Sequence, residues 1–212
     1  MANQPSTPLD EPQILEDSSD FFQQYGKPAL LATAAFIAIL IGSAFWMHSR
    51  IAREEEASEK LTGATTEQQW QAIAAQYPGT GAAALALIQA AHAEQAAANF
   101  NGAATLYENI ARQYPSHPAL PAVQYARAQC LEASGNRADA KNAYEAIFHA
   151  KPAHAFAGGA AIALAKIYYN EKNLTAARQV LGDYLSNTSA QSGGSRVQEA
   201  RGLLRDLSAI SQ

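Results

Sequence analysis

The chain contains a single cysteine and no run or patch of basic residues. One cysteine cannot form an intramolecular disulfide, and it cannot build a thiolate metal site alone. Cys130 lies among Ala128, Leu131 and Ala133, so we interpret it as a small buried apolar residue. Because no cluster of lysine and arginine is present to neutralise phosphates, the sequence disfavours nucleic-acid binding.

Catalytic and cofactor motifs are also missing from the sequence. His149 and His154 are five residues apart, which does not match the i, i+4 spacing of two metal ligands on one helix turn. The pair Gly158-Gly159 is not followed by the Lys-Ser/Thr of a phosphate-binding loop. We therefore expect no enzyme activity, no cofactor and no metal site.

Alanine is abundant and supplies much of the 48% hydrophobic content. Alanine is the best helix former, whereas sheets are enriched in β-branched and aromatic residues. A length of 212 residues allows one ordinary domain and an appendage. The composition predicts an all-α protein.

The amino-terminal part combines an acidic tail with a long uncharged segment. Residues 1–26 contain five acidic residues and no basic residue, which predicts a disordered tail. Residues 29–47 carry no charge, and as a helix they would span about 28 Å, close to the hydrocarbon thickness of a bilayer. We expect a single transmembrane anchor at 27–49, followed by a solvated helical stalk at 50–62.

A cleaved signal peptide is the competing interpretation of this segment. Gly42-Ser43-Ala44 resembles a cleavage site, but the preceding region is long and acidic where a short basic one is expected. The bases near the span are Lys27 on one side and Arg50, Arg53 and Lys60 on the other. This count favours a cytoplasmic carboxyl-terminal domain, although long translocated domains often override the rule.

The rest of the chain repeats itself with a period of 37 residues. Residues 99–115 read NFNGAATLYENIARQYP, and residues 136–152 read NRADAKNAYEAIFHAKP. About three and a half copies occupy residues 63–190. The recurring positions are Asn99, Asn136 and Asn173; Ala91, Ala128 and Ala165; Ala103, Ala140 and Ala177; and Tyr107, Tyr144 and Leu181.

The spacing within a copy predicts a pair of helices. Ala103, Tyr107 and Ile110 lie at i, i+4 and i+7, on one face of a helix. Pro115 cannot continue that helix, and Asn99 is suited to a left-handed turn or a helix cap. The shared alanines allow two helices to cross closely. Each hairpin cannot bury its apolar face alone, so we expect the copies to stack into a solenoid.

Residues 191–212 form the predicted end of the domain, a flexible linker and a capping helix. The helix has one apolar face, with charged residues opposite, as a terminal cap should have. The apolar residues of this face are Val197, Ala200, Leu203, Leu204 and Leu207.

A solenoid of this kind offers a concave surface lined by its first helices. The groove-facing side chains are expected to be His92, Tyr125, Gln129, Glu132, Lys166 and Tyr169, together with Ile88, Gln95 and Ile162. Tyrosines with mixed polar groups are typical of a surface that binds peptides or helices. The alternative is packing between copies, which we prefer for Ile88 and Ile162 and leave open for Tyr125 and Tyr169.

Two family resemblances follow from these residues. The alanine, aromatic and proline of the second helices resemble the tetratricopeptide repeat, whose period is about 34. The first helices lack the Trp and Leu-Gly of that family and keep only the small residue, as at Ala91. This resemblance implies a tetratricopeptide-like solenoid of helical hairpins. Together with the uncharged segment, it leads us to expect an all-α fold with a single transmembrane helix followed by that solenoid.

The second resemblance concerns the whole architecture. An acidic tail, the segment from Phe21-Phe22 through Gly26-Lys27 and Gly42 to Leu61, and an alanine-rich repeat domain resemble the YfgM-type ancillary subunit of the bacterial Sec translocon. The resemblance implies an inner-membrane protein with a cytoplasmic amino terminus and a periplasmic domain. It also implies two partners, SecYEG and a membrane-anchored peptidyl-prolyl-isomerase-like chaperone.

Two other functions stay open. One is a cytoplasm-facing scaffold, which the base count around the anchor favours. The other is an envelope-biogenesis module that gathers outer-membrane or cell-wall enzymes.

Overall fold

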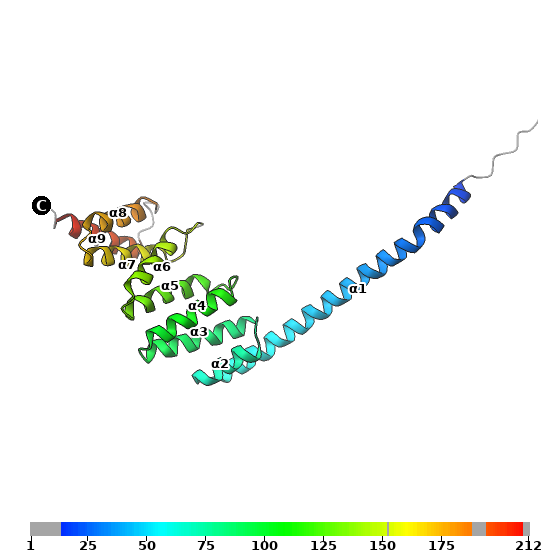
Figure 1. The fold of residues 1–212 in the computed structure, drawn as a ribbon, viewed down its shortest axis with the longest axis horizontal. Coiled ribbons are helices and arrows are strands. Elements are labelled where there is room, and N and C mark those ends of the chain that lie inside the picture. Colours follow the sequence, from blue (N-terminus) through cyan, green and yellow to red (C-terminus); the bar gives the residue numbers. More distant parts are fainter. Residues whose placement is uncertain (1–13, 152, 188–193, 210–212) are drawn as a thin grey trace, which may run out of the picture. The chain divides into compact units, whose positions relative to one another are not determined.

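The computed structural model describes residues 14–151, 153–187 and 194–209, and every regular element in these ranges is an α-helix (Figure 1). The predicted all-α fold is confirmed. Residues 1–13 of the predicted tail, residue 152 and residues 188–190 of the predicted repeats, and residues 191–193 and 210–212 of the predicted linker and capping helix lie outside the described residues. The helices are α1 (Ile14–Gly63), α2 (Glu67–Gln76), α3 (Gly81–Ala96), α4 (Phe100–Gln113), α5 (Leu120–Ala133), α6 (Arg137–Phe148), α7 (Ala157–Asn170), α8 (Leu174–Asn187) and α9 (Ser195–Ala209).

Helix α1 contains the predicted anchor and is longer than the sequence suggested. It begins at Ile14, so it includes residues 14–26, which the sequence analysis assigned to the tail. From Leu30 onward the helix is long and apolar enough to cross a membrane. Its exposed large apolar side chains are Leu30, Leu31, Phe36, Ile37, Ile39, Leu40, Ile41, Phe45, Trp46, Met47 and Ile51.

The chain divides into two compact units, residues 1–52 and 53–212. The boundary falls inside α1, so the last turns of this helix belong to the repeat unit. Ala57 is fully buried there and packs in one apolar cluster with Ile73, Tyr77 and Ala82. Most of the other side chains in residues 50–62, the predicted solvated stalk, are exposed.

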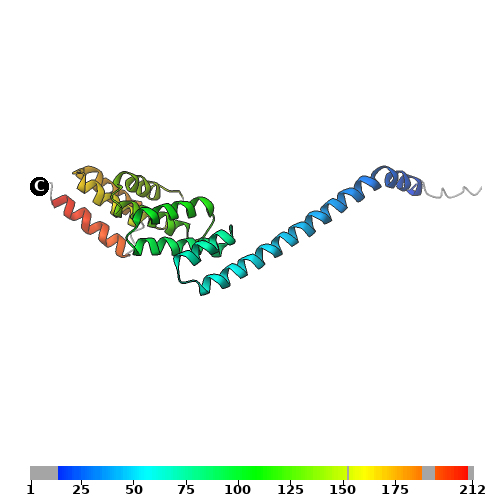
Figure 2. The same ribbon diagram turned by 60° about the horizontal axis from the view of Figure 1, so that its bottom comes forward.

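From α2 onward, each helix packs against the next one along the chain. Figure 2 shows α3 with α4, α5 with α6, and α7 with α8 as hairpins that follow one another. The second helices begin at Phe100, Arg137 and Leu174, at intervals of 37 residues. The period of the sequence is therefore the period of the hairpins, as in a tetratricopeptide-like solenoid.

The regular spacing of the asparagines positions the turn inside each hairpin. The side-chain oxygens of Asn99 and Asn173 accept hydrogen bonds from the backbone N–H groups of Gly102 and Ala176, at 3.2 and 3.1 Å. Asn136 caps α6 in the same way. The left-handed position is the residue before each asparagine: Ala98 (φ 59°), Gly135 (φ 85°) and Lys172 (φ 61°). The asparagines therefore act as helix caps, and their neighbours make the turn.

The recurring residues form the interior of the repeat unit. Tyr107 and Tyr144 are both only 1% exposed, and Leu181 is fully buried at the equivalent position. The small residues on which they pack are buried as well: Ala91, Ala103, Ala128, Ala140, Ala165 and Ala177. Alanine at these positions lets the helices approach closely enough for large side chains to fill the space between hairpins.

Candidate protein-binding groove

The predicted groove residues come from equivalent positions of α3, α5 and α7. Five of them are exposed, namely His92, Gln129, Glu132, Lys166 and Tyr169, whereas Tyr125 is half-buried. Ile88 packs against the central apolar cluster, and Ile162 is only 3% exposed. Both isoleucines thus pack in the apolar interior, which is the alternative that their sequence positions favour.

Tyr125 packs between hairpins. Its ring stacks on Phe156, with centroids 5.1 Å apart and planes 13° apart, and it is tilted against Tyr144 at 6.0 Å. Its hydroxyl lies over Gly159 at the start of α7, where an added Cβ would be 2.6 Å away. This burial raises the pKa of the Tyr125 hydroxyl. The glycine therefore makes room for the tyrosine.

A hydrogen-bond acceptor on the first helix of the hairpin holds each of the two recurring tyrosines, Tyr107 and Tyr144. The Tyr107 hydroxyl donates to Gln95 Oε1 at 2.7 Å, and the Tyr144 hydroxyl donates to Glu132 Oε2 at 2.8 Å. These pairs satisfy hydroxyls that burial would otherwise leave costly. The third copy has Leu181 in place of the tyrosine, so its first helix needs no acceptor. Tyr169 occupies the acceptor's position and is 48% exposed.

Tyr169 lines a cavity of about 180 Å³ between α7 and α9. Ala165 and Lys166 of α7 form the same wall, and the opposite wall comes from α9. The residues that α9 contributes are Leu203, Asp206 and Leu207. The floor is apolar, and a cation and a carboxylate lie at its edges, so the hollow fits one large apolar side chain of a bound polypeptide.

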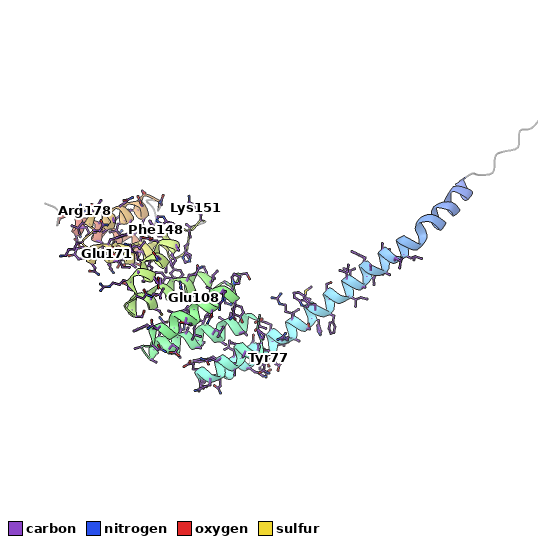
Figure 3. All side chains as sticks on the ribbon, in the orientation of Figure 1. Tyr77, Glu108, Phe148, Lys151, Glu171 and Arg178 are labelled. Carbon is purple, nitrogen blue, oxygen red and sulfur yellow. The ribbon has the colours of Figure 1, made fainter. Side chains whose placement is uncertain are left out.

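Helix α9 is held in place at both ends. The Arg178 guanidinium of α8, labelled in Figure 3, donates to the Leu207 carbonyl from Nη2 at 2.7 Å and from Nε at 3.2 Å. At the other end, Lys166 Nζ lies 3.4 Å from Glu199 Oε1. The sequence pattern of α9 predicts only a capping role for this helix. Leu203 and Leu207 of α9 are spaced i and i+4, so they lie on one face of the helix. This spacing is the sequence signal that α9 could form the second wall of the cavity.

A second hollow, of about 280 Å³, lies among α4, α5 and α6. His154 Nε2 is 3.0 Å from Gln124 Oε1, and Arg127 Nη2 is 3.2 Å from Glu108 Oε2. Burial lowers the pKa of His154. Within the described ranges, Arg127 Nε is the buried side-chain polar atom that has no hydrogen-bond partner. These polar pairs therefore lie at the edge of the second hollow, whose floor is rich in alanine.

In the described part of the chain, no group of three or more His, Cys, Asp and Glu side chains could hold a metal ion. Cys130 is fully buried, and burial raises the pKa of its thiol.

Comparison with known proteins gives matches in structure only. No protein-family model matches the chain, and no curated protein matches it. One match is a crystal structure of nearly identical TPR-like repeats, attributed to a kinesin light chain of Podosopora anserina. The two sequences are 17% identical and the TM-score is 0.47, and the match covers 76% of this chain and 93% of that one. A substituted form of those repeats gives 16% identity, a TM-score of 0.48, and coverage of 75% and 92%. Because neither TM-score reaches 0.5, the fold assignment rests on the helix order and contacts described above.

Proposed function

We propose that this protein is a membrane-anchored protein-interaction module whose binding surface is the groove of α3, α5 and α7. The observation that carries the proposal is the hollow between α7 and α9, which has an apolar floor and an exposed tyrosine. Exposed aromatic side chains beside an apolar pocket are typical of residues that dominate protein interfaces. The surrounding groove is polar and of mixed charge, as a polypeptide backbone requires.

The membrane anchor is supported by the surface of α1. The segment from Leu30 to Met47 carries a continuous apolar surface, which would be unfavourable in water. The hydroxyls of Thr33 and Ser43 donate to the carbonyls of Leu30 and Leu40, both at 2.9 Å. Pairing of polar groups within the helix is what the interior of a bilayer demands.

The specific role we propose is assistance to secreted proteins at the periplasmic exit of the Sec translocon. This proposal rests on the resemblance of the tail, the anchor and the repeat domain to the YfgM-type subunit. Its partners would be SecYEG and a membrane-anchored isomerase-like chaperone. A groove that accepts one large apolar side chain would suit a chain that has not yet buried its own core.

Orientation is tested by a reporter fused after Gln212. A reporter that is active only in the periplasm is expected to be active, and one that is active only in the cytoplasm is expected to be silent. The opposite result would exclude the translocon-exit role. It would favour the cytoplasm-facing scaffold, which the bases at Arg50 and Arg53 favour over the single Lys27.

The identity of the partners is tested by gentle detergent extraction of the tagged full-length protein, followed by mass spectrometry. Translocon subunits and a periplasmic isomerase are expected to copurify. Cell-wall or outer-membrane enzymes in their place would indicate the envelope-biogenesis scaffold.

The groove itself is tested by comparing two neighbouring tyrosines. Tyr169→Ala should reduce recovery of the partners by about tenfold, the usual range for an interface aromatic. Tyr168→Phe is the matched control, because the Tyr168 hydroxyl donates to Glu145 Oε1 at 2.8 Å and its ring lies beside Lys141 of α6. Equal loss in both variants would place the binding surface elsewhere.

A further inference from the structure

Two histidines recur at the repeat interval, each just before the first helix of a hairpin. His117 precedes α5 and His154 precedes α7, 37 residues apart. In both, the ring Nδ1 accepts a hydrogen bond from the backbone N–H two residues on, from Ala119 at 3.2 Å and from Phe156 at 3.1 Å. Ala119 and Phe156 are the N-cap residues of α5 and α7, and neither caps its helix with its own side chain. Each histidine therefore forms the turn into a helix that lacks a side-chain cap.

This turn requires the neutral form of the imidazole ring. A ring nitrogen that accepts a hydrogen bond cannot carry a proton, so Nε2 of His154 holds the single ring proton. Nε2 lies 3.0 Å from Gln124 Oε1 and donates to it. One ring thus ties the start of α7 to α5, in the preceding hairpin. A second proton, on Nδ1, would turn the acceptor of the Phe156 N–H into a donor.

The surroundings of His154 oppose the uptake of that proton. The ring lines the second hollow, where the charged residues are Glu108 of α4 and Arg127 of α5, and the lining residues of α6 are alanines and an isoleucine. Arg127 Nη2 lies 3.2 Å from Glu108 Oε2, so these two charges offset each other. His149 and Lys151, in the same connection as His154, are exposed. Burial lowers the pKa of His154.

The residue that His154 holds is part of the contact between the second hairpin (α5 and α6) and the third (α7 and α8). The Phe156 ring stacks on Tyr125 of α5, with centroids 5.1 Å apart. The Tyr125 hydroxyl in turn lies over Gly159, in the first turn of α7. Release of the Phe156 N–H would therefore remove one of the contacts that place α7 against α5.

We propose that His154 is an acid-sensitive joint between the second and third hairpins, which holds the start of α7 when the ring is neutral and releases it when the ring is protonated. Because burial lowers the pKa of the folded-state ring, its contribution to stability is complete above the unfolded pKa of about 6.5 and is lost as the pH falls below that value. Lys166 and Tyr169 lie further along α7, so acid would also weaken the groove. Only this last consequence rests on the proposed function of the groove.

Hydrogen exchange of the full-length protein in detergent measures the joint. The protection of the peptide that covers the start of α7 is compared at about pH 7.5 and about pH 5, on either side of the ordinary pKa of histidine. Protection is the exchange rate of the unstructured peptide at the same pH divided by the measured rate. Loss of one such hydrogen bond should lower the protection in acid by about fivefold. The start of α3 is the internal control, because the equivalent residue is Thr80, whose hydroxyl accepts from the Ala83 N–H at 3.1 Å and does not titrate in this range.

Two substitutions separate protonation from loss of the side chain. His154→Asn keeps an acceptor for the Phe156 N–H, because asparagine bonds the backbone two residues on, and it cannot titrate. This variant should abolish the change with pH at α7. His117→Asn is the matched control and should leave that change intact. Circular dichroism at both pH values checks that the variants remain helical.

Three results would overturn the proposal. One is equal protection of the start of α7 at both pH values in the unmodified protein. Another is an undiminished change with pH in His154→Asn. The third is an equal fall at the start of α3, which would indicate general unfolding in acid. None of the three bears on whether the groove binds other proteins.

Discussion

Gly159 provides the sharpest test of how the hairpins pack. Glycine within a helix normally costs about 1 kcal/mol relative to alanine. At Gly159, however, an added Cβ would lie 2.6 Å from the Tyr125 hydroxyl and 2.9 Å from its ring carbon Cζ. The ring cannot easily move, because it is stacked on Phe156 and tilted against Tyr144. Overpacking of this kind costs about 1–3 kcal/mol, and the helix preference of alanine offsets about 1 kcal/mol of that cost, so Gly159→Ala should destabilise the repeat unit by up to about 2 kcal/mol in total.

Gly182 is the matched control for this prediction. It lies inside α8, and nothing is within 4 Å of the position that its Cβ would take. Gly182→Ala should therefore stabilise by about 0.5–1 kcal/mol. Urea unfolding of the full-length protein in detergent, followed by circular dichroism, measures both. Tyr125→Phe should recover part of the loss in Gly159→Ala. The packing account fails if Gly159→Ala stabilises as much as Gly182→Ala does.

Three further predictions use the same assay. Lys172→Gly should stabilise by about 0.5 kcal/mol, because Lys172 has a positive φ that glycine adopts without strain; a loss would contradict the turn geometry. Asn136→Ala should destabilise by about 1 kcal/mol through loss of the cap on α6, and an unchanged midpoint would argue against it. Burial raises the pKa of the Tyr107 hydroxyl in the folded state. The contribution of the neutral hydroxyl to the stability of the fold is therefore complete below the unfolded pKa of about 10, and it is lost as the pH rises above that value. Tyr107→Phe should accordingly lose less stability than the unmodified protein between neutral and strongly alkaline pH.

The repeat architecture could be predicted because its physical causes are local. A small residue, an aromatic and an apolar residue at helical spacing define one buried face, and Asn99 marks the cap. Repetition at a fixed interval then requires that the copies stack in the same way. The pattern predicts that Tyr107 and Tyr144 lie in the interior, and both are only 1% exposed.

The docking of the stalk could not be predicted from the same kind of pattern. Glu54, Glu56 and Lys60 look like the solvated face of an exposed helix. Their partners are the Tyr77 hydroxyl and two backbone N–H groups of α3. These groups lie more than twenty residues further along the chain and carry no charge that a sequence pattern could reveal. Only the folded arrangement brings these groups together.

The roles of two groove tyrosines could be predicted from the equivalent positions in the other copies of the repeat. Tyr125 is equivalent to Ile88 and Ile162, which were expected to pack between copies, and it packs there too. Tyr169 is equivalent to Gln95 and Glu132, the acceptors for buried tyrosines. The third copy has Leu181 in place of the buried tyrosine, so no tyrosine hydroxyl there needs an acceptor at position 169. Tyr169 instead lies exposed beside the hollow between α7 and α9.

The most direct test of the central claim is site-specific photo-crosslinking in intact cells. The crosslinker is placed at Tyr169 in the groove and, as a control, at Gln179, an exposed position of α8. Specific adducts with membrane-borne proteins are expected at Tyr169 and not at Gln179. Adducts at Gln179 alone, or none at Tyr169, would contradict the assignment of this groove as the surface that holds other proteins.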